Sequence, residues 1–277
     1  MVLIAILLGT LTAGIGSVWL AALLSFGVLT RYTQHMLSLA AGALLATAFM
    51  HLLPEAFESQ IDPQKLFATL LVGLVFFFLL DKAELWHHGH EHHDAEREGQ
   101  AGASGAAQAV ADHGHSHEAG HGHGHSHASG GWAVLAGDSV HAFGDGILIA
   151  SAFMADLRLG VVATLAVLVH EVPHHMGDLI VLRQSSGNRR AALVKVSLAG
   201  AVTALGGMVG YALVDKLFDF LPFFLIIASS SFVYVALADL IPQLQKRATA
   251  SETAAQIAWL AIGIALVTLI SGLVHAQ

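Results

Sequence analysis

Long apolar stretches recur along almost the whole chain and are separated by short polar segments. Each stretch is continuously apolar and does not alternate residue by residue, which favours membrane-spanning helices over the strands of a transmembrane barrel. The pattern predicts an all-α integral membrane protein with about eight spans, at Val2–Leu29, His35–Leu53, Leu66–Trp86, Trp132–Met154, Leu157–Leu182, Ala191–Leu213, Phe218–Leu244 and Ala254–Val274.

One polar, low-complexity segment interrupts this series. Residues 87–131 consist largely of Gly, Ala, Ser and His, and the sequence His113-Gly-His-Ser-His117 is repeated as His123-Gly-His-Ser-His127. Without large apolar side chains the segment cannot bury a core, so we expect it to be disordered and to bind metal ions through its imidazoles. The predicted organisation is three helices in residues 1–86, this loop, and five helices in residues 132–277, with all helices in one membrane domain.

The distribution of Lys and Arg predicts the orientation, because cytoplasmic loops carry the excess of positive charge. With the N-terminus outside, three basic residues fall in outer loops, namely Lys65, Arg158 and Lys216. Nine fall on the inner side, namely Arg31, Lys82, Arg97, Arg183, Arg189, Arg190, Lys195, Lys246 and Arg247. We therefore expect both termini outside and the His-rich loop in the cytosol, in a cell (inner) membrane.

Two spans end in similar sequences, His51-Leu-Leu-Pro54-Glu55 and Asp239-Leu-Ile-Pro242-Gln243. They belong to the second and seventh spans, which run in opposite directions under the predicted orientation. Each span is the middle helix of a terminal group of three. Proline-broken helices in inverted repeats are frequent in transporters, so the pattern indicates a 3+2+3 inverted-repeat arrangement.

The amino-acid composition excludes several classes of function. Hydrophobic residues make up 55% of the chain and charged residues 12%, with a net charge of −8, so nucleic acid is not an expected partner. There is no cysteine, which excludes thiolate catalysis and Cys-type zinc sites. Histidine is unusually abundant, at 19 residues.

Several of the ionisable residues lie inside predicted spans. The fourth span contains His141-Ala-Phe-Gly-Asp145, and the fifth contains His170-Glu171-Val-Pro-His174-His175-Met-Gly-Asp178. Ionisable groups at this depth are costly and are usually functional. A spacing of four residues places His141 with Asp145, His170 with His174, and Glu171 with His175 on shared helix faces. Imidazole and carboxylate together form a ligand set suited to Zn²⁺ and its first-row neighbours.

Pro173 adds a change in the backbone of the fifth span. It cannot donate a hydrogen bond to the carbonyl of Val169, so it is expected to kink the helix and free an acceptor beside His170. Pro54 and Pro242 are expected to act in the same way on Met50 and Ala238. Broken backbone of this kind is tolerated at membrane depth where it lines a cavity.

These residues carry a resemblance to the ZIP family of metal transporters. His141, Phe143, Asp145 and Gly146 match the family's His-Asn-Phe-x-Asp-Gly signature. The LIV-1-like subgroup carries His-Glu-x-Pro-His-Glu-x-Gly-Asp, which is matched by His170, Glu171, Pro173, His174, Gly177 and Asp178. The eight spans, the outside termini and the His-rich loop fit as well, so the resemblance covers the whole chain.

The chain departs from the family pattern at two positions. Ala142 replaces the usual Asn, and His175 replaces the second Glu. Some ZIPs hold two adjacent metals with help from that Asn and from an acid in the sixth span, which here has no acidic residue between Ala191 and Val214. The resemblance implies import toward the cytosol by alternating access, often as a homodimer.

The sequence thus predicts a transporter of divalent metal, with Zn²⁺ as the favoured substrate beside Fe²⁺, Mn²⁺ and Cd²⁺. The predicted transport site consists of His141, Asp145, His170, Glu171 and His174, with His175 and Asp178 as auxiliary groups. Two alternatives remain. His170-Glu171-x-x-His174 also matches the helix motif of zinc peptidases, in which Glu171 would be the general base, and the chain could be a membrane metal sensor that does not transport.

Overall fold

The computed structural model describes residues 1–25, 33–80, 82, 127–186, 188–244 and 249–275, and all regular secondary structure in them is helical. The first group comprises α1 (Val2–Leu11), η1 (Thr12–Gly16), α2 (Ser17–Ser25), α3 (Thr33–Thr47), η3 (Ala48–Leu52), α4 (Leu53–Phe57) and a helix at Pro63–Leu80. The second comprises α6 (His127–Ala155), α7 (Leu157–Ser186), α8 (Arg189–Lys216), η4 (Phe218–Phe220), α9 (Leu221–Tyr234), η5 (Val235–Leu240), α10 (Ile241–Leu244) and α11 (Ala250–His275).

These helices confirm the prediction of an all-α membrane protein with several passes. Within the described residues, seven helical segments are long and apolar enough to cross a bilayer. The remaining long helix, α6, has 29 residues, and Asp138, His141 and Asp145 make it more polar than the others. All eight predicted spans therefore coincide with helical segments, and the bounds agree to within several residues wherever the structure describes them.

One local expectation needs correction. Helix α6 begins at His127, so residues 127–131, which we expected to be disordered, are helical; the rest of the predicted loop lies outside the described residues. Pro173 lies within α7, which is α-helical on both sides of it. The kink expected at Pro173 stays a prediction.

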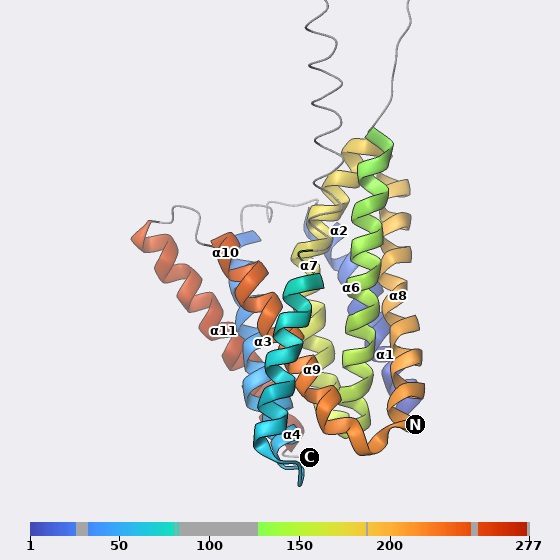
Figure 1. The fold of residues 1–277 in the computed structure, drawn as a ribbon. Helices are drawn as coiled ribbons and strands as arrows, with labels where there is room; N and C mark the ends of the chain where they lie inside the picture. The colour runs from blue at the N-terminus through green and yellow to red at the C-terminus, as the bar shows by residue number, and fades with distance from the viewer. Residues whose placement is uncertain (26–32, 81, 83–126, 187, 245–248, 276–277) are drawn as a thin grey trace, which may run out of the picture.

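The helices form two groups that lie side by side (Figure 1). One group contains α1–η1–α2, α6, α7 and α8, and its tightest packing is between α6 and α8. The other contains α3–η3–α4, α9–η5–α10, α11 and the helix at Pro63–Leu80. Helix α7 also packs on α3, so it connects the two groups. The start of α1 and the end of α11 lie at one end of the bundle, and the start of α6 lies at the other (Figure 1).

The two segments that suggested an inverted repeat have the same local conformation. Each contains a π-helical turn, η3 in one and η5 in the other, that ends shortly before Pro54 or Pro242. The two segments run in opposite directions (Figure 1), and they pack crosswise, with η3 against α9 and η5 against α3. Each proline lacks the backbone N–H that would donate a hydrogen bond in a regular α-helix, and a π-helical turn accommodates this loss. Such turns are frequent at functional sites.

Glycines allow the helices of the first group to approach closely. A Cβ atom on Gly146 of α6 would meet the carbonyl oxygen of Thr203 on α8, and one on Gly206 of α8 would meet that of Phe143 on α6. Gly14 of η1 and Gly200 of α8 meet in the same way. Lipid tails are as apolar as the side chains they surround, so the hydrophobic effect does not drive helices together within a bilayer. Close van der Waals packing of this kind is then a main source of helix association. Gly146 therefore fixes the position of α6, the helix that carries His141 and Asp145.

We predict that Gly206→Ala destabilises the protein, because the added methyl group would overlap backbone atoms of α6. Overpacking of this kind costs about 1–3 kcal/mol. The thermal unfolding midpoint of the purified protein in detergent should fall accordingly. Gly272→Ala on α11, where an added Cβ meets nothing within 4 Å, is the matched control and should leave the midpoint unchanged or raise it. Equal effects of both substitutions would contradict this account of the α6–α8 contact.

Candidate metal site

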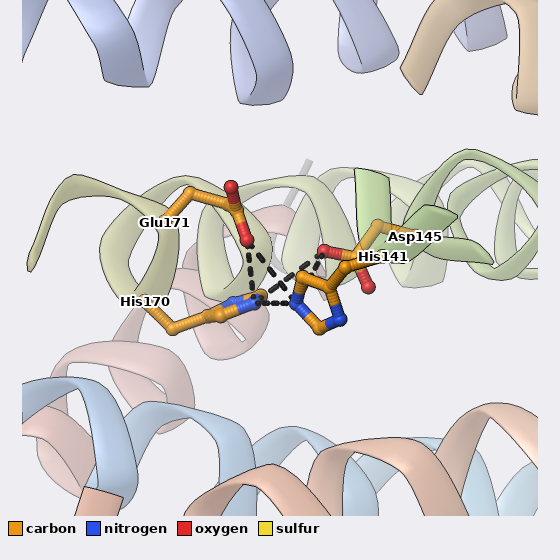
Figure 2. A group of neighbouring side chains, drawn as sticks. All are labelled: His141, Asp145, His170 and Glu171. Carbon is orange, nitrogen blue, oxygen red and sulfur yellow. Dashed lines mark hydrogen bonds and ion pairs between the residues drawn. The ribbon is translucent and has the colours of Figure 1, made fainter. Parts of the chain in front are cut away.

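Helices α6 and α7 place a cluster of ionisable side chains near the middle of the bundle. Helix α7 has 30 residues, which corresponds to a length of about 45 Å, and His170 and Glu171 fall close to its midpoint. His141 and Asp145 occupy the central part of α6, which packs against α7. The four side chains point toward one another from the two helices (Figure 2). The predicted depth of these residues in the membrane therefore agrees with the helix lengths.

Four atoms define the centre of this cluster. His170 Nε2 lies 3.2 Å from Glu171 Oε1 and 3.4 Å from Asp145 Oδ2. His141 Nε2 lies 3.3 Å from Glu171 Oε1 and 3.8 Å from Asp145 Oδ2, and the two imidazole nitrogens are 3.5 Å apart. Four ligands about 2.1 Å from one tetrahedral Zn²⁺ would lie about 3.4 Å from one another. The spacing of the four atoms therefore fits a tetrahedral Zn²⁺ without rearrangement of the helices.

A backbone contact sets the state of His170. Its Nδ1 lies 3.2 Å from the carbonyl oxygen of Ala166, one turn earlier on α7. A carbonyl can only accept a hydrogen bond, so Nδ1 donates and a neutral ring directs the lone pair of Nε2 into the cluster. Metal-binding histidines are commonly oriented by a hydrogen bond of this type. The helix itself thus prepares His170 as a ligand.

The carboxylate oxygens that face the cluster lack good hydrogen-bond donors from the protein. Asp145 Oδ2 and Glu171 Oε1 are buried, and neither receives a hydrogen bond of good geometry. The two imidazole nitrogens face each other at 3.5 Å, so protons on both of these atoms at once would repel. A cation among the four atoms satisfies all of them at once, which makes metal binding the best physical explanation of the cluster.

Access to the cluster is asymmetric. Asp145, His170 and Glu171 are each no more than 2% exposed, whereas the side chain of His141 is 34% exposed. The cluster is therefore exposed on the side of His141, while Asp145, His170 and Glu171 are enclosed by packed helices. Partial exposure of one ligand is consistent with a site that must bind and release its ion.

The other predicted site residues lie around this cluster. The ring centroid of His174 is 6.1 Å from those of His141 and His170, which are themselves 5.7 Å apart, so His174 lies next to the cluster although it is not one of the four residues whose ligand atoms converge. His175 and Asp178 belong to a separate group one to two helical turns further along α7, together with Asp138 of α6. Sequence reasoning missed Asp138, although its position three residues before His141 places it on the same helix face.

His51, from the first of the two similar segments, belongs to neither group of ligand atoms. His51 Nδ1 is 3.5 Å from Ser271 Oγ on α11. The side chain of Asp239 lies outside the described residues. Ser230 of α9 donates a hydrogen bond of 3.1 Å to the carbonyl of Leu70 on the helix at Pro63–Leu80 and so links these two helices.

Comparison with known proteins identifies the family of the chain. The model of the family described as ZIP zinc transporter matches residues 1–271. The chain belongs to the ZIP zinc transporter family. Zinc transporter ZIP13 of Pongo abelii is 26% identical over 291 residues, which cover 96% of this chain and 77% of that protein. Members of this family are transporters and not enzymes, so the chain is a multi-pass membrane protein of a transporter family.

Other relatives match a shorter region at higher identity. Zinc transporter ZIP10 of Mus musculus is 34% identical over 113 residues, 41% of this chain and 14% of that protein. Zinc transporter ZIP4 of Homo sapiens is 35% identical over 115 residues, 42% of this chain and 18% of that protein. The matched region is thus a small part of both longer relatives.

We predict that His170→Ala abolishes metal uptake while expression and thermal stability are retained. The substitution removes an enclosed nitrogen that no other group at this depth can replace. Uptake of Zn²⁺ into proteoliposomes that contain the purified variant is the measurement. His35→Ala is the control, because His35 packs edge-on against Trp259 away from the cluster, and it should transport normally. Undiminished uptake by the His170 variant would remove His170 from the site.

Proposed function

We propose that this ZIP family member carries Zn²⁺ across the membrane into the cytosol through the cluster of His141, Asp145, His170 and Glu171. The observation that carries the proposal is the mutual spacing of the four ligand atoms, 3.2–3.8 Å in the five distances above. His174, beside the cluster, supplies a further imidazole for an ion that is entering or leaving. The ion here is the substrate, so its ligands must release it.

The same geometry argues against the peptidase alternative. In the H-E-x-x-H motif both histidines bind zinc and the glutamate acts as a base on a bound water. Here Glu171 Oε1 is one of the four converging atoms, at 3.2 Å from His170 Nε2, and His174 is not among them. This geometry supports a role for Glu171 as a ligand rather than as a base. A sensor that does not transport would keep the same site, and metal flux in proteoliposomes distinguishes it from a transporter.

Zinc is the favoured substrate because of the ligand types. Two imidazole nitrogens and two carboxylate oxygens suit Zn²⁺, and divalent Mn and Fe bind such sites less tightly. Cd²⁺ is a chemically similar substrate for the same ligands. Comparison of Zn²⁺, Cd²⁺, Fe²⁺ and Mn²⁺ uptake in proteoliposomes tests this assignment.

We predict that His170→Glu lowers the preference for Zn²⁺ over Mn²⁺ and retains transport. The carboxylate keeps a ligand at this position of α7 but makes the set richer in oxygen, which favours harder ions. The measurement is the ratio of the two uptake rates in a competition assay. His35→Glu, outside the cluster, is the matched control and should keep the wild-type ratio. If His170→Glu retains flux and its ratio equals that of the wild type, His170 does not contact the transported ion.

Orientation follows from the excess of basic residues at the end of the bundle where α6 begins, which we assign to the cytosol. Native cysteine is absent, so single introduced thiols report on topology. Gln60→Cys, in the exposed connection after α4, should react with an impermeant maleimide in intact cells. Ser251→Cys, exposed at the start of α11, should react only after permeabilisation. The reverse pattern would invert the proposed direction of transport.

A further inference from the structure

A second group of possible ligands lies next to the transport cluster. Asp138 of α6 and His175 and Asp178 of α7 each offer one ligand atom, and these atoms all lie within 4.8 Å of one another. The side chain of His175 is fully buried and that of Asp138 is 9% exposed. The transport cluster does not use any of the three residues, and their ligand types again combine imidazole with carboxylate.

The hydrogen bonds of Ser17 determine which nitrogen of His175 faces this group. Ser17 Oγ donates its proton to the carbonyl of Gly14 at 2.7 Å, and it lies 3.0 Å from His175 Nδ1. Since the hydroxyl proton is already used, Ser17 Oγ accepts a hydrogen bond from Nδ1–H. A neutral His175 therefore carries its lone pair on Nε2. Outer contacts that fix a tautomer in this way are typical of metal-binding histidines.

The unprotonated nitrogen faces oxygen atoms that are also acceptors. His175 Nε2 lies 3.8 Å from Asp138 Oδ1 and 3.2 Å from Glu171 Oε2, and it has no hydrogen-bond partner of its own. The second oxygen of Asp138 is also buried without a hydrogen bond. Buried acceptors placed together without a donor are costly, and a cation between them removes that cost.

Glu171 connects the two groups. Its Oε1 lies in the transport cluster, 3.2 Å from His170 Nε2, while its Oε2 lies 3.2 Å from His175 Nε2. One carboxylate can therefore contact an ion on either side. Asp138 lies about one helical turn from His141 toward the start of α6, so the second group lies nearer the end of the bundle from which α6 begins.

We propose that Asp138, His175 and Asp178 form a second divalent-metal site, which receives the ion from the transport cluster through Glu171 as the ion moves toward the start of α6. The inference rests on the proposed transport function for its direction but not for the existence of the site. With two carboxylates and one imidazole, the second site should take the same class of ion, such as Zn²⁺ or Cd²⁺, and hold it beside water ligands.

Cadmium soaked into crystals of the full chain tests the site by its anomalous scattering. We expect two peaks, one among His141, Asp145, His170 and Glu171 and one among Asp138, His175 and Asp178. The double variant Asp138→Asn, Asp178→Asn should lose the second peak alone. The matched control, Asp215→Asn with Asp219→Asn, removes the same charge from exposed positions and should keep both peaks.

A milder variant tests the site where the double variant fails to fold. Ser17→Ala leaves every ligand in place and removes only the acceptor for His175 Nδ1. The cadmium concentration at which the second peak reaches half occupancy should rise about 10- to 100-fold, while the first peak is unaffected. An equal effect on both peaks would show that Ser17 acts on the fold and not on this site.

The possible outcomes separate the two proposals. A wild-type crystal with the first peak alone at saturating cadmium overturns the second site and leaves the transport site intact. A crystal with only the second peak overturns the transport site and keeps this inference. Measurement of Zn²⁺ uptake tests whether the second site lies on the path. Loss of the second site should lower the maximal rate of uptake and change the half-saturating Zn²⁺ concentration less. An unchanged maximal rate would exclude the site from the path.

Discussion

The structure depends on buried acceptor atoms that converge between α6 and α7. His170 Nε2 lies 3.4 Å from Asp145 Oδ2 and 3.2 Å from Glu171 Oε1, and neither oxygen receives a hydrogen bond of good geometry. Buried acceptors placed together in this way are costly, and a cation among them would remove that cost. In the proposed function, this cost of the empty cluster contributes to the binding energy of the ion.

The remaining helices hold these atoms in place by backbone contacts. Gly146 and Gly206 bring α6 against α8 at backbone distance, which fixes the helix that carries His141 and Asp145. The carbonyl of Ala166 orients His170 from within α7. The π-helical turn η1 ends just before Ser17, whose hydroxyl orients His175. Helix packing and an irregular turn therefore supply the outer contacts that metal ligands require.

The two groups of ligands share Glu171, and this connection suggests how an ion could advance. In the proposed path, one oxygen of Glu171 would hold an ion in the first cluster, and its other oxygen faces His175. Movement between the groups needs exchange of ligands over a few ångströms rather than passage through an apolar gap. In the sequence, the segment rich in histidine directly precedes α6, and α6 begins at the end of the bundle toward which the proposed path leads.

The sequence by itself determined the helices and the ligand types. Continuous apolar runs define spans because length and hydropathy suffice for that, and the spacing of four residues correctly paired Glu171 with His175, whose side-chain atoms lie 3.2 Å apart. Only the tertiary structure decided how the candidate ligand residues divide between the two groups. Periodicity within one helix cannot give the register of α6 against α7, and that register places His170 and Glu171 with His141 and Asp145 but His175 and Asp178 with Asp138. The contact of Ser17 with His175 could not be predicted from the sequence, because the two residues are 158 positions apart and meet only where the start of α2 packs on α7.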